Sequence, residues 1–208
     1  MHVVFKTLRW KNFLSTGDNF TEISLDIVPS SLITGPNGSG KSTMLDALTF
    51  ALFNKPHRNI SKTQLVNSFN ERSCLVEITF NIGGTEYLVR RGISPTVFQI
   101  YKNDDLMPQP SSARDYQTML ESGILRMNYK TFNQVVVLGS SSFIPFMQLS
   151  TNNRRQIIED LLGITVFTKM NGILKSSHST SKEQSRLLKA QLSGVEGKRA
   201  IQRKYITD

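Results

Sequence analysis

The chain has 208 residues, of which 38% are hydrophobic and 20% charged, so it is long enough for one domain with its own core. Lys and Arg total 25 against 16 Asp and Glu, and the net charge of +9 suits a polyanionic partner such as nucleic acid. The single cysteine, Cys74, excludes an internal disulfide and a cysteine-cluster metal site. The lack of paired cysteines fits a reducing, intracellular setting. The first residues lack a long apolar stretch, so we expect no secretion signal, and no apolar run approaches the roughly 20 residues of a membrane span.

The first third of the chain alternates strand and turn patterns before a helix. Alternating apolar residues predict strands over 3–10 and 23–27, and a short apolar run predicts a buried strand over 31–34. A glycine-rich turn at 35–40 follows. Leucines at helical spacing then predict a helix over 43–53. Strand, glycine loop and helix therefore follow one another directly.

The middle of the chain predicts a β-hairpin. Gly83 and Gly84 separate two apolar-rich runs and suit a tight turn that needs positive φ angles. This turn sets a register in which the following residues face each other: Phe80 and Tyr87, Ile78 and Val89, Cys74 and Ile93, and Glu77 and Arg90.

The remaining patterns continue to the end of the chain. We predict a strand at 97–102, a linker at 107–112, helices at 115–121 and 129–134, and a strand at 135–138. Ser150 can cap a helix that runs to Leu162 and ends at Gly163. After Ile164 the chain is either one long, weakly apolar helix that needs a partner or a disordered tail.

The glycine loop carries the main chemical signal. Residues 35–42 read GPNGSGKS and match G-x-x-x-x-G-K-[ST] at every fixed position. Glycines let backbone N–H groups approach phosphate oxygens, and the helix that follows directs its positive end at the same anion. The lysine of this motif reaches the β- and γ-phosphates, and the serine hydroxyl is a Mg²⁺ ligand. The sequence therefore predicts ATP and Mg²⁺ as cofactors, held by Asn37, Gly38, Ser39, Gly40, Lys41, Ser42 and Thr43.

A hydrolytic site also needs a carboxylate after an apolar strand, to position Mg²⁺ and activate water. No run of four apolar residues in the chain is followed by Asp or Glu, and the run at 135–138 ends in Gly139. We therefore expect no catalytic residue in this chain, which is either half of an ATPase or a nucleotide-binding module.

Further stretches extend the pattern. They are KNFLS at 11–15, MLDALTFALF at 44–53, FNQVVVL at 132–138, FIPFM at 143–147 and RRQIIEDLLGI at 154–164. With PNGSGKST, they resemble the N-terminal lobe of the SMC-like ABC ATPases of DNA repair nucleases, the SbcC type. That family includes the large exonuclease subunits of T-even-like bacteriophages. The resemblance covers about residues 1–165.

The resemblance implies an α/β, P-loop fold. Residues 1–164 are expected to form the N-terminal half of an ABC-type nucleotide-binding domain, with an antiparallel β-subdomain at about 70–105. Residues 165–208 would begin a coiled-coil helix. The implied partners are the C-terminal lobe of the same ATPase, a second ATPase subunit, an SbcD-type metal-dependent nuclease and DNA.

The resemblance also implies the activity. The chain would be the ATP-binding half of an exonuclease ATPase subunit in DNA recombination and repair, working in the cytoplasm (the host cytoplasm if it is phage-encoded). Hydrolysis would then need the C-terminal lobe and dimerisation. One alternative is an architectural SMC-type ATPase that clamps DNA without a nuclease partner. Another is a stand-alone kinase or NTPase, against which the missing carboxylate counts.

Two positions depart from the family pattern. The family has an arginine near the phosphates in its early K-N-F-R-S stretch, where this chain has Leu14, so only Ser15 is left as a candidate nucleotide contact. A glutamine that contacts Mg²⁺ in the family is replaced by Ser140, a shorter side chain and the weaker candidate metal ligand.

Several charged residues have two interpretations. Asp46 either supports the nucleotide site indirectly or is a surface or capping charge, and we favour the second. A basic cluster after the first helix either approaches nucleotide or DNA or is a solvated loop; it comprises Lys55, His57, Arg58 and Lys62. Beyond Ile164, nine Lys and Arg stand against three Asp and Glu, a surplus of 9 − 3 = +6. This basic segment either follows DNA phosphates or is a coiled-coil face. LSGVE at 192–196 resembles an ABC signature motif, and we interpret it as a chance match.

Overall fold

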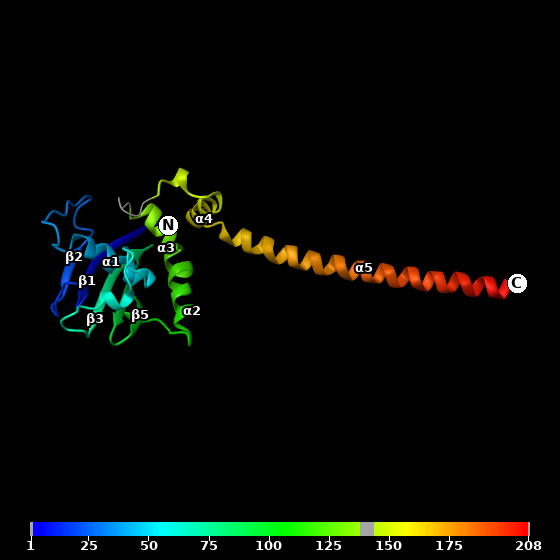
Figure 1. Cartoon of the computed structure of the whole chain (residues 1–208), viewed down its shortest axis with the longest axis horizontal. Coiled ribbons are helices and arrows are strands. Elements are labelled where there is room, and N and C mark those ends of the chain that lie inside the picture. Colours follow the sequence, from blue (N-terminus) through cyan, green and yellow to red (C-terminus); the bar gives the residue numbers. More distant parts are fainter. Residues whose placement is uncertain (1, 138–143, 208) are drawn as a thin grey trace. The chain divides into compact units, whose positions relative to one another are not determined.

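The structure is a computed structural model of the chain and describes residues 2–137 and 144–207. The chain divides into two compact units, Met1–Leu161 and Leu162–Asp208. The first unit is a sheet with helices, and the second consists mainly of one long helix (Figure 1). Among the helices of the described residues, none combines the length and the apolar character needed to cross a membrane.

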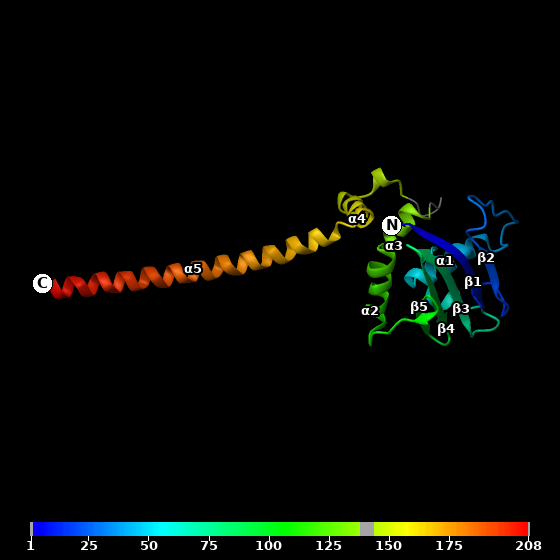
Figure 2. The same cartoon turned by 180° about the vertical axis from the view of Figure 1, so that it is seen from behind.

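Six antiparallel strands form one sheet in the order β2-β1-β3-β4-β5-β6 (Figures 1 and 2). The strands are β1 Val3–Lys11, β2 Thr21–Ser24, β3 Cys74–Ile82, β4 Thr85–Ile93, β5 Val97–Lys102 and β6 Asp105–Leu106. β1 lies between β2 and β3. The antiparallel β-subdomain expected at about 70–105 therefore shares its sheet with the N-terminal strands.

The β3–β4 hairpin has the predicted register. Its turn residues Gly83 and Gly84 have φ angles of 55° and 82°, which glycine adopts without strain. All four predicted pairs are observed: Phe80 with Tyr87, Ile78 with Val89, Cys74 with Ile93, and Glu77 with Arg90. Glu77 is buried and accepts hydrogen bonds from both Arg9 and Arg90. This carboxylate therefore links β1, β3 and β4 on the polar face of the sheet.

The other face of the sheet is apolar and packs against α1 (Lys41–Phe53). Leu8, Val76 and Ile78 of the strands are fully buried there, as are Ala51 and Leu52 of the helix. Further helical segments complete the first unit: Lys62–Leu65 (3-10), α2 Ala113–Thr118, Met119–Leu125 (π), α3 Tyr129–Val135, Phe146–Gln148 (3-10) and α4 Thr151–Leu162. Helices are thus present where the sequence predicted them. The helix predicted at 115–121 is observed as α2, which the π-helical segment Met119–Leu125 continues.

Three strand predictions were wrong in whole or in part. β2 ends at Ser24, and Ile27 beyond it is 75% exposed. Residues 31–34 form no strand and Leu32 is 89% exposed, because no described strand pairs with this segment and a strand needs a neighbour for its N–H and C=O groups. Residues 135–137 are not a strand either, since Val135 is the last residue of α3. Leu138 lies outside the described residues.

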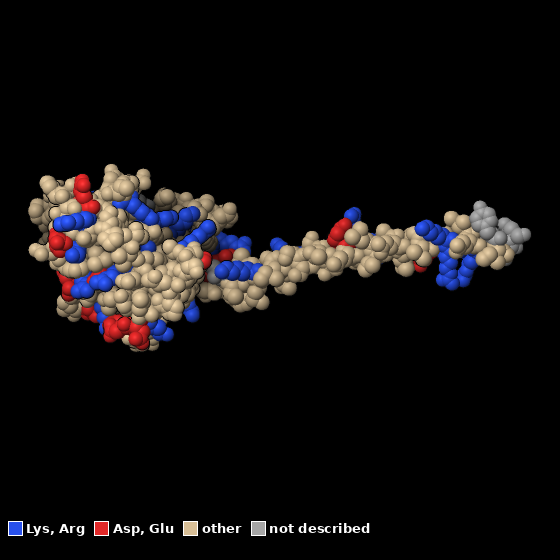
Figure 3. Space-filling view, turned by 90° about the horizontal axis from the view of Figure 1, so that it is seen from below, with Lys and Arg blue, Asp and Glu red and all other residues tan. Residues whose placement is uncertain are grey.

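The end of the chain is helical. The Ser150 hydroxyl accepts a hydrogen bond from the Asn153 N–H at 3.4 Å, and Gly163, with φ 66°, follows α4, as predicted. The second unit is a single helix, α5 (Thr165–Thr207), rather than a disordered tail. The LSGVE segment lies inside this helix rather than at a helix start. Lys and Arg side chains gather near the C-terminal end of α5 (Figure 3).

Candidate nucleotide-binding site

A cleft of about 630 Å³ surrounds the phosphate loop and the start of α1. This volume lies within the range of about 300–1,000 Å³ that is usual for small-molecule sites. The loop after β1 lines the cleft with Leu14 and Ser15, and the segment before β3 lines it from Gln64 to Phe69. The phosphate loop and α1 add Asn37, Gly38, Gly40, Lys41, Ser42 and Thr43.

The phosphate loop has the backbone that its glycines permit. Gly38 and Gly40 have φ angles of 85° and 91°, a region that favours glycine. Gly40 is the N-cap of α1 and provides no side-chain cap for the first helical turn. The Thr43 N–H donates to the Gly40 carbonyl oxygen at 3.0 Å. The N–H groups before it, at the start of the helix, have no partner within that helix, so they can donate hydrogen bonds to an anion in the cleft.

Lys41 folds back over the loop that precedes it. Its Nζ donates hydrogen bonds to the carbonyl oxygens of Gly35 and Pro36 at 2.6 and 2.7 Å. A lysine ammonium has three N–H donors, so one donor and the full positive charge are left for a ligand. The loop carbonyls therefore fix the position of the cation at the cleft.

The other predicted contacts differ in position. Ser42 is exposed and lines the cleft, whereas Thr43 lines it but is 5% exposed. Ser39 packs against Gly35, where an added Cβ would lie 2.7 Å from the serine hydroxyl oxygen. Ser39 does not line the cleft. Ser140 lies outside the described residues.

Arg58, a member of the basic cluster with two interpretations, lines the cleft. Its guanidinium contacts the carboxylate of Asp46 through Nε at 2.6 Å and a terminal nitrogen at 2.5 Å, and its backbone N–H donates to the same group at 2.9 Å. Asp46 is completely buried in α1. Our preference for a surface or capping charge at Asp46 was therefore wrong: this carboxylate holds Arg58 at the wall of the cleft. The two residues are 12 positions apart, and no local pattern connects them.

The rest of the basic cluster lies elsewhere. The Lys55 ammonium lies 5.6 Å from the centroid of the Tyr129 ring. His57 Nδ1 lies 2.8 Å from Asn133 Oδ1. Burial, with the nearby charges of Arg91 and Lys55, lowers the pKa of Lys62. Only Arg58 of the four residues lines the cleft.

Two asparagines tie the remaining walls together. The Asn67 side chain donates hydrogen bonds to the carbonyl oxygens of Leu14 and Thr16 at 3.0 and 3.1 Å. Its backbone N–H donates to the carbonyl oxygen of Asn12 at 2.9 Å. Both asparagines are buried. This network joins the segment after β1 to the segment before β3 and so shapes the cleft on the side of Ser15.

The side chains near the cleft indicate how a metal ion could bind. Across residues 2–137 and 144–207, no group of three or more His, Cys, Asp and Glu side chains is placed to hold a metal ion. The exposed Ser42 hydroxyl beside the phosphate loop fits a Mg²⁺ that arrives with its nucleotide, because Mg²⁺ is commonly held by few protein groups together with substrate phosphates.

Comparison with known proteins gives the family. Residues 7–204 match the family described as AAA domain. Exonuclease subunit 2 of Escherichia phage RB69 is 42% identical over 188 residues, which are 90% of this chain and 33% of that protein. The DNA double-strand break repair Rad50 ATPase of Methanococcus maripaludis is 29% identical over 184 residues, 86% of this chain and 18% of that protein. The chain thus spans a third or less of the length of these relatives.

A solved structure supports the fold. The Smc head domain of Pyrococcus furiosus, with an extended coiled coil and bound to the C-terminal domain of ScpA, superposes with a TM-score of 0.63 at 19% identity. The alignment covers 99% of this chain and 53% of that chain. The predicted α/β fold of an SMC-like head is therefore confirmed. The chain belongs to the AAA-domain family, in the SMC-like branch that includes Rad50 and the phage exonuclease subunits, a family that implies nucleotide binding.

Proposed function

We propose that this chain is the ATP-binding half of the ATPase subunit of a DNA end-processing exonuclease complex in recombination and repair. The observation that carries the proposal is the cleft at the start of α1, where glycines with positive φ, uncapped N–H groups and an oriented lysine converge. The relatives named exonuclease subunit 2 and Rad50 ATPase support the biological setting.

The proposal gives each cleft residue a task. The backbone around Gly38 and Gly40 takes the phosphate oxygens, and Lys41 supplies its free donor to the β- and γ-phosphates. The Ser42 hydroxyl would hold Mg²⁺, which neutralises charge on the phosphates when it is bound. Arg58 adds a second cation at the cleft wall, and Ser15 is a further polar contact from the loop after β1.

Hydrolysis would need a second lobe. The sequence has no run of four apolar residues followed by Asp or Glu. The apolar segment after β2 is exposed: Ile27, Val28, Leu32 and Ile33 are 45–89% exposed. An apolar segment of this kind fits a strand that pairs with a complementary C-terminal lobe. Residues 1–164 would then be the N-terminal half of the nucleotide-binding domain, and 165–208 the first part of a coiled coil.

The remaining partners follow from the same proposal. They are a second ATPase subunit that completes the site, an SbcD-type nuclease and DNA. The rival function, an architectural SMC-type ATPase, is less well supported, because the likeness to the Smc head at 19% identity concerns the fold alone. Capture of a metal-dependent nuclease by the assembled ATPase distinguishes the two functions.

The first test of this proposal is direct. Wild type and Lys41→Ala are titrated with ATP and Mg²⁺ by calorimetry, and Lys55→Ala serves as a control because Lys55 lies outside the cleft. Loss of a charge-assisted contact should cost about 1.5–3 kcal/mol, which is about a 10- to 150-fold weaker affinity. Equal affinities for wild type and Lys41→Ala would falsify the proposal.

A further inference from the structure

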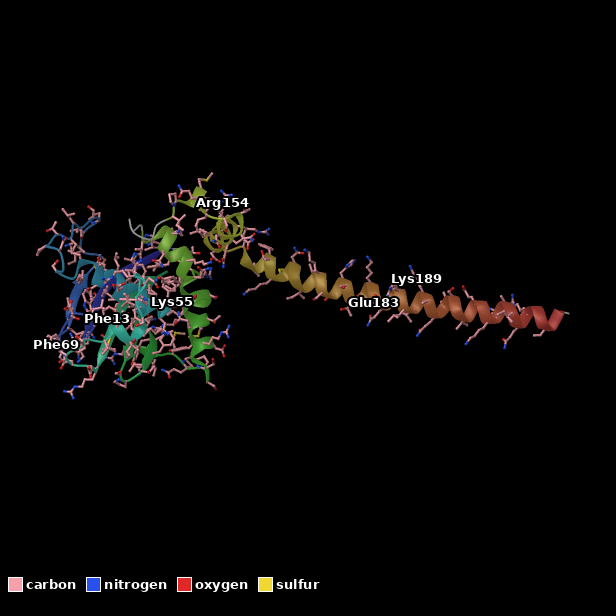
Figure 4. All side chains as sticks on the ribbon, in the orientation of Figure 1. Phe13, Lys55, Phe69, Arg154, Glu183 and Lys189 are labelled. Carbon is pink, nitrogen blue, oxygen red and sulfur yellow. The ribbon has the colours of Figure 1, made fainter. Side chains whose placement is uncertain are left out.

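Phe69 is the most exposed large apolar side chain in the structure and lies at the nucleotide cleft. It is 94% exposed and contributes to the cleft lining that also contains Lys41 and Ser42. Figure 4 shows Phe69 at the margin of the first unit, whereas Phe13, which is fully buried, lies in its interior. A single exposed apolar side chain is ordinary on a protein surface, so exposure alone carries no argument. What distinguishes this ring is its location in the cleft lining and the hydrogen bonds that hold its backbone.

The backbone that carries Phe69 is held by hydrogen bonds to two buried asparagines, Asn67 and Asn12. Asn67 Oδ1 accepts hydrogen bonds from the N–H groups of Phe69 and Asn70 at 2.9 and 3.1 Å. The Asn67 carbonyl oxygen accepts another from the Glu71 N–H at 2.8 Å. Asn70 in turn donates from Nδ2 to Asn12 Oδ1 at 2.6 Å. The backbone that carries Phe69 is therefore hydrogen-bonded to two buried asparagines, Asn67 and Asn12, which places the ring at the cleft.

The cleft has two chemically distinct parts. Lys41, Ser42 and Arg58 provide cationic and polar groups suited to phosphates. Leu14, Val66 and Phe69 provide an apolar part, and among the residues that the structure describes Phe69 contributes its only aromatic ring. A nucleoside triphosphate has the same division, because its phosphates are anionic and its base is a flat aromatic ring. Aromatic side chains bind bases by stacking.

We infer that the phenyl ring of Phe69 stacks on the base of the nucleotide whose triphosphate occupies the loop at 35–42. The inference rests on the proposed nucleotide binding and adds the group that holds the base. Stacking uses the π-face that every base has, so Phe69 strengthens binding without selecting adenine over guanine.

The test separates the base from the phosphates. Wild type, Phe69→Ala and Phe69→Tyr of the full chain are titrated with Mg²⁺-ATP and with Mg²⁺-tripolyphosphate, which lacks base and sugar. Base–aromatic stacking predicts that Phe69→Ala binds ATP about 5- to 150-fold more weakly and tripolyphosphate with unchanged affinity. Phe69→Tyr should keep the wild-type affinity for both ligands. Phe20→Ala is the control, since Phe20 is 41% exposed and contacts Arg9 and Lys11 rather than the cleft.

The other outcomes overturn the inference in distinguishable ways. If Phe69→Ala binds ATP as wild type does, the ring serves another purpose, such as contact with a second lobe. If affinities for ATP and tripolyphosphate fall by the same factor, the ring acts through the fold of the loop and not on the base. If wild type binds neither ligand, the proposed nucleotide binding itself fails, and the inference falls with it.

Discussion

Replacing Asp46 with asparagine should destabilise the fold and weaken nucleotide binding at the same time. The Asp46 carboxylate is buried, and the Arg58 side chain is held against it by two guanidinium contacts of 2.5 and 2.6 Å. Asparagine has nearly the same volume, so it tests the chemistry of the contact and not its packing. It removes the negative charge and turns an NH₂ group toward a guanidinium that can only donate. The guanidinium should then leave the cleft wall.

The magnitude follows from the contacts. A hydrogen bond to a charged group contributes about 1.5–3 kcal/mol, so the two side-chain contacts would amount to about 3–6 kcal/mol in a fully buried site. Because the Arg58 side chain is 46% exposed, water compensates much of the loss, and half of that figure, about 1.5–3 kcal/mol, is the expected cost. For a domain of this size each kcal/mol lowers the melting temperature by about 2–4 °C, so the shift should be about 3–12 °C.

Urea unfolding measures this change. Trp10 is the only tryptophan in the chain and is 3% exposed, so its fluorescence reports loss of the core. Asp115→Asn is the matched control, because Asp115 is an exposed aspartate in α2. ATP affinity is measured on both variants. If the free energies of unfolding of Asp46→Asn and Asp115→Asn differ by less than about 0.5 kcal/mol, the buried contact does not stabilise the fold and the reasoning is refuted.

Three further predictions test other parts of the molecule. The chain alone should release phosphate from ATP much more slowly than about 1 s⁻¹, because it lacks the carboxylate strand; turnover at that rate or above would reveal a missed catalytic group. In the assembled ATPase, four basic residues of α5 are replaced with glutamine: Lys198, Arg199, Arg203 and Lys204. If they contact DNA phosphates, affinity should fall for every DNA sequence, and the slope of log affinity against log salt concentration should become shallower by up to about 0.9 per residue. An unchanged affinity and slope would assign the DNA surface elsewhere. Burial raises the pKa of Cys74 to about 12, so a thiol reagent at pH 8 should label only unfolded chains. Labelling of the native chain would contradict this prediction. As the pH rises from about 9 toward 12, only the unfolded state loses the thiol proton, so the free energy of unfolding should fall. Cys74→Ala should reduce that fall.

Local patterns were sufficient where neighbouring residues decide the structure. The two-glycine turn at Gly83 and Gly84 determines the β3–β4 register, since a tight turn leaves one way to pair the flanking strands. The phosphate loop and the helix after it are likewise contiguous in sequence. Such elements need no knowledge of the rest of the chain.

Apolar runs were misread where the outcome depends on distant partners. The run at 135–137 has the composition of a strand, but Val135 is the last residue of α3, and Val135 and Val136 are 42% and 43% exposed. Periodicity alone cannot distinguish a short strand from a helical segment in so short an apolar run. The run at 31–34 has no described strand to pair with. The contact between Asp46 and Arg58 and the bonds made by Asn67 were also unpredictable, because they join residues through loops of irregular conformation.

α1 has an unusual division along its length. Its first turn lines the cleft, while the residues from Ala47 to its end are buried against the sheet. A ligand that occupies the cleft therefore binds only when that helix is in place, and the unfolded chain cannot compete for it. Mass action then makes nucleotide concentration a determinant of folding: at 100 times its dissociation constant, such a ligand adds about 2.7 kcal/mol to the free energy of unfolding. Purification, storage and crystallisation of this protein should accordingly depend on nucleotide as much as on temperature.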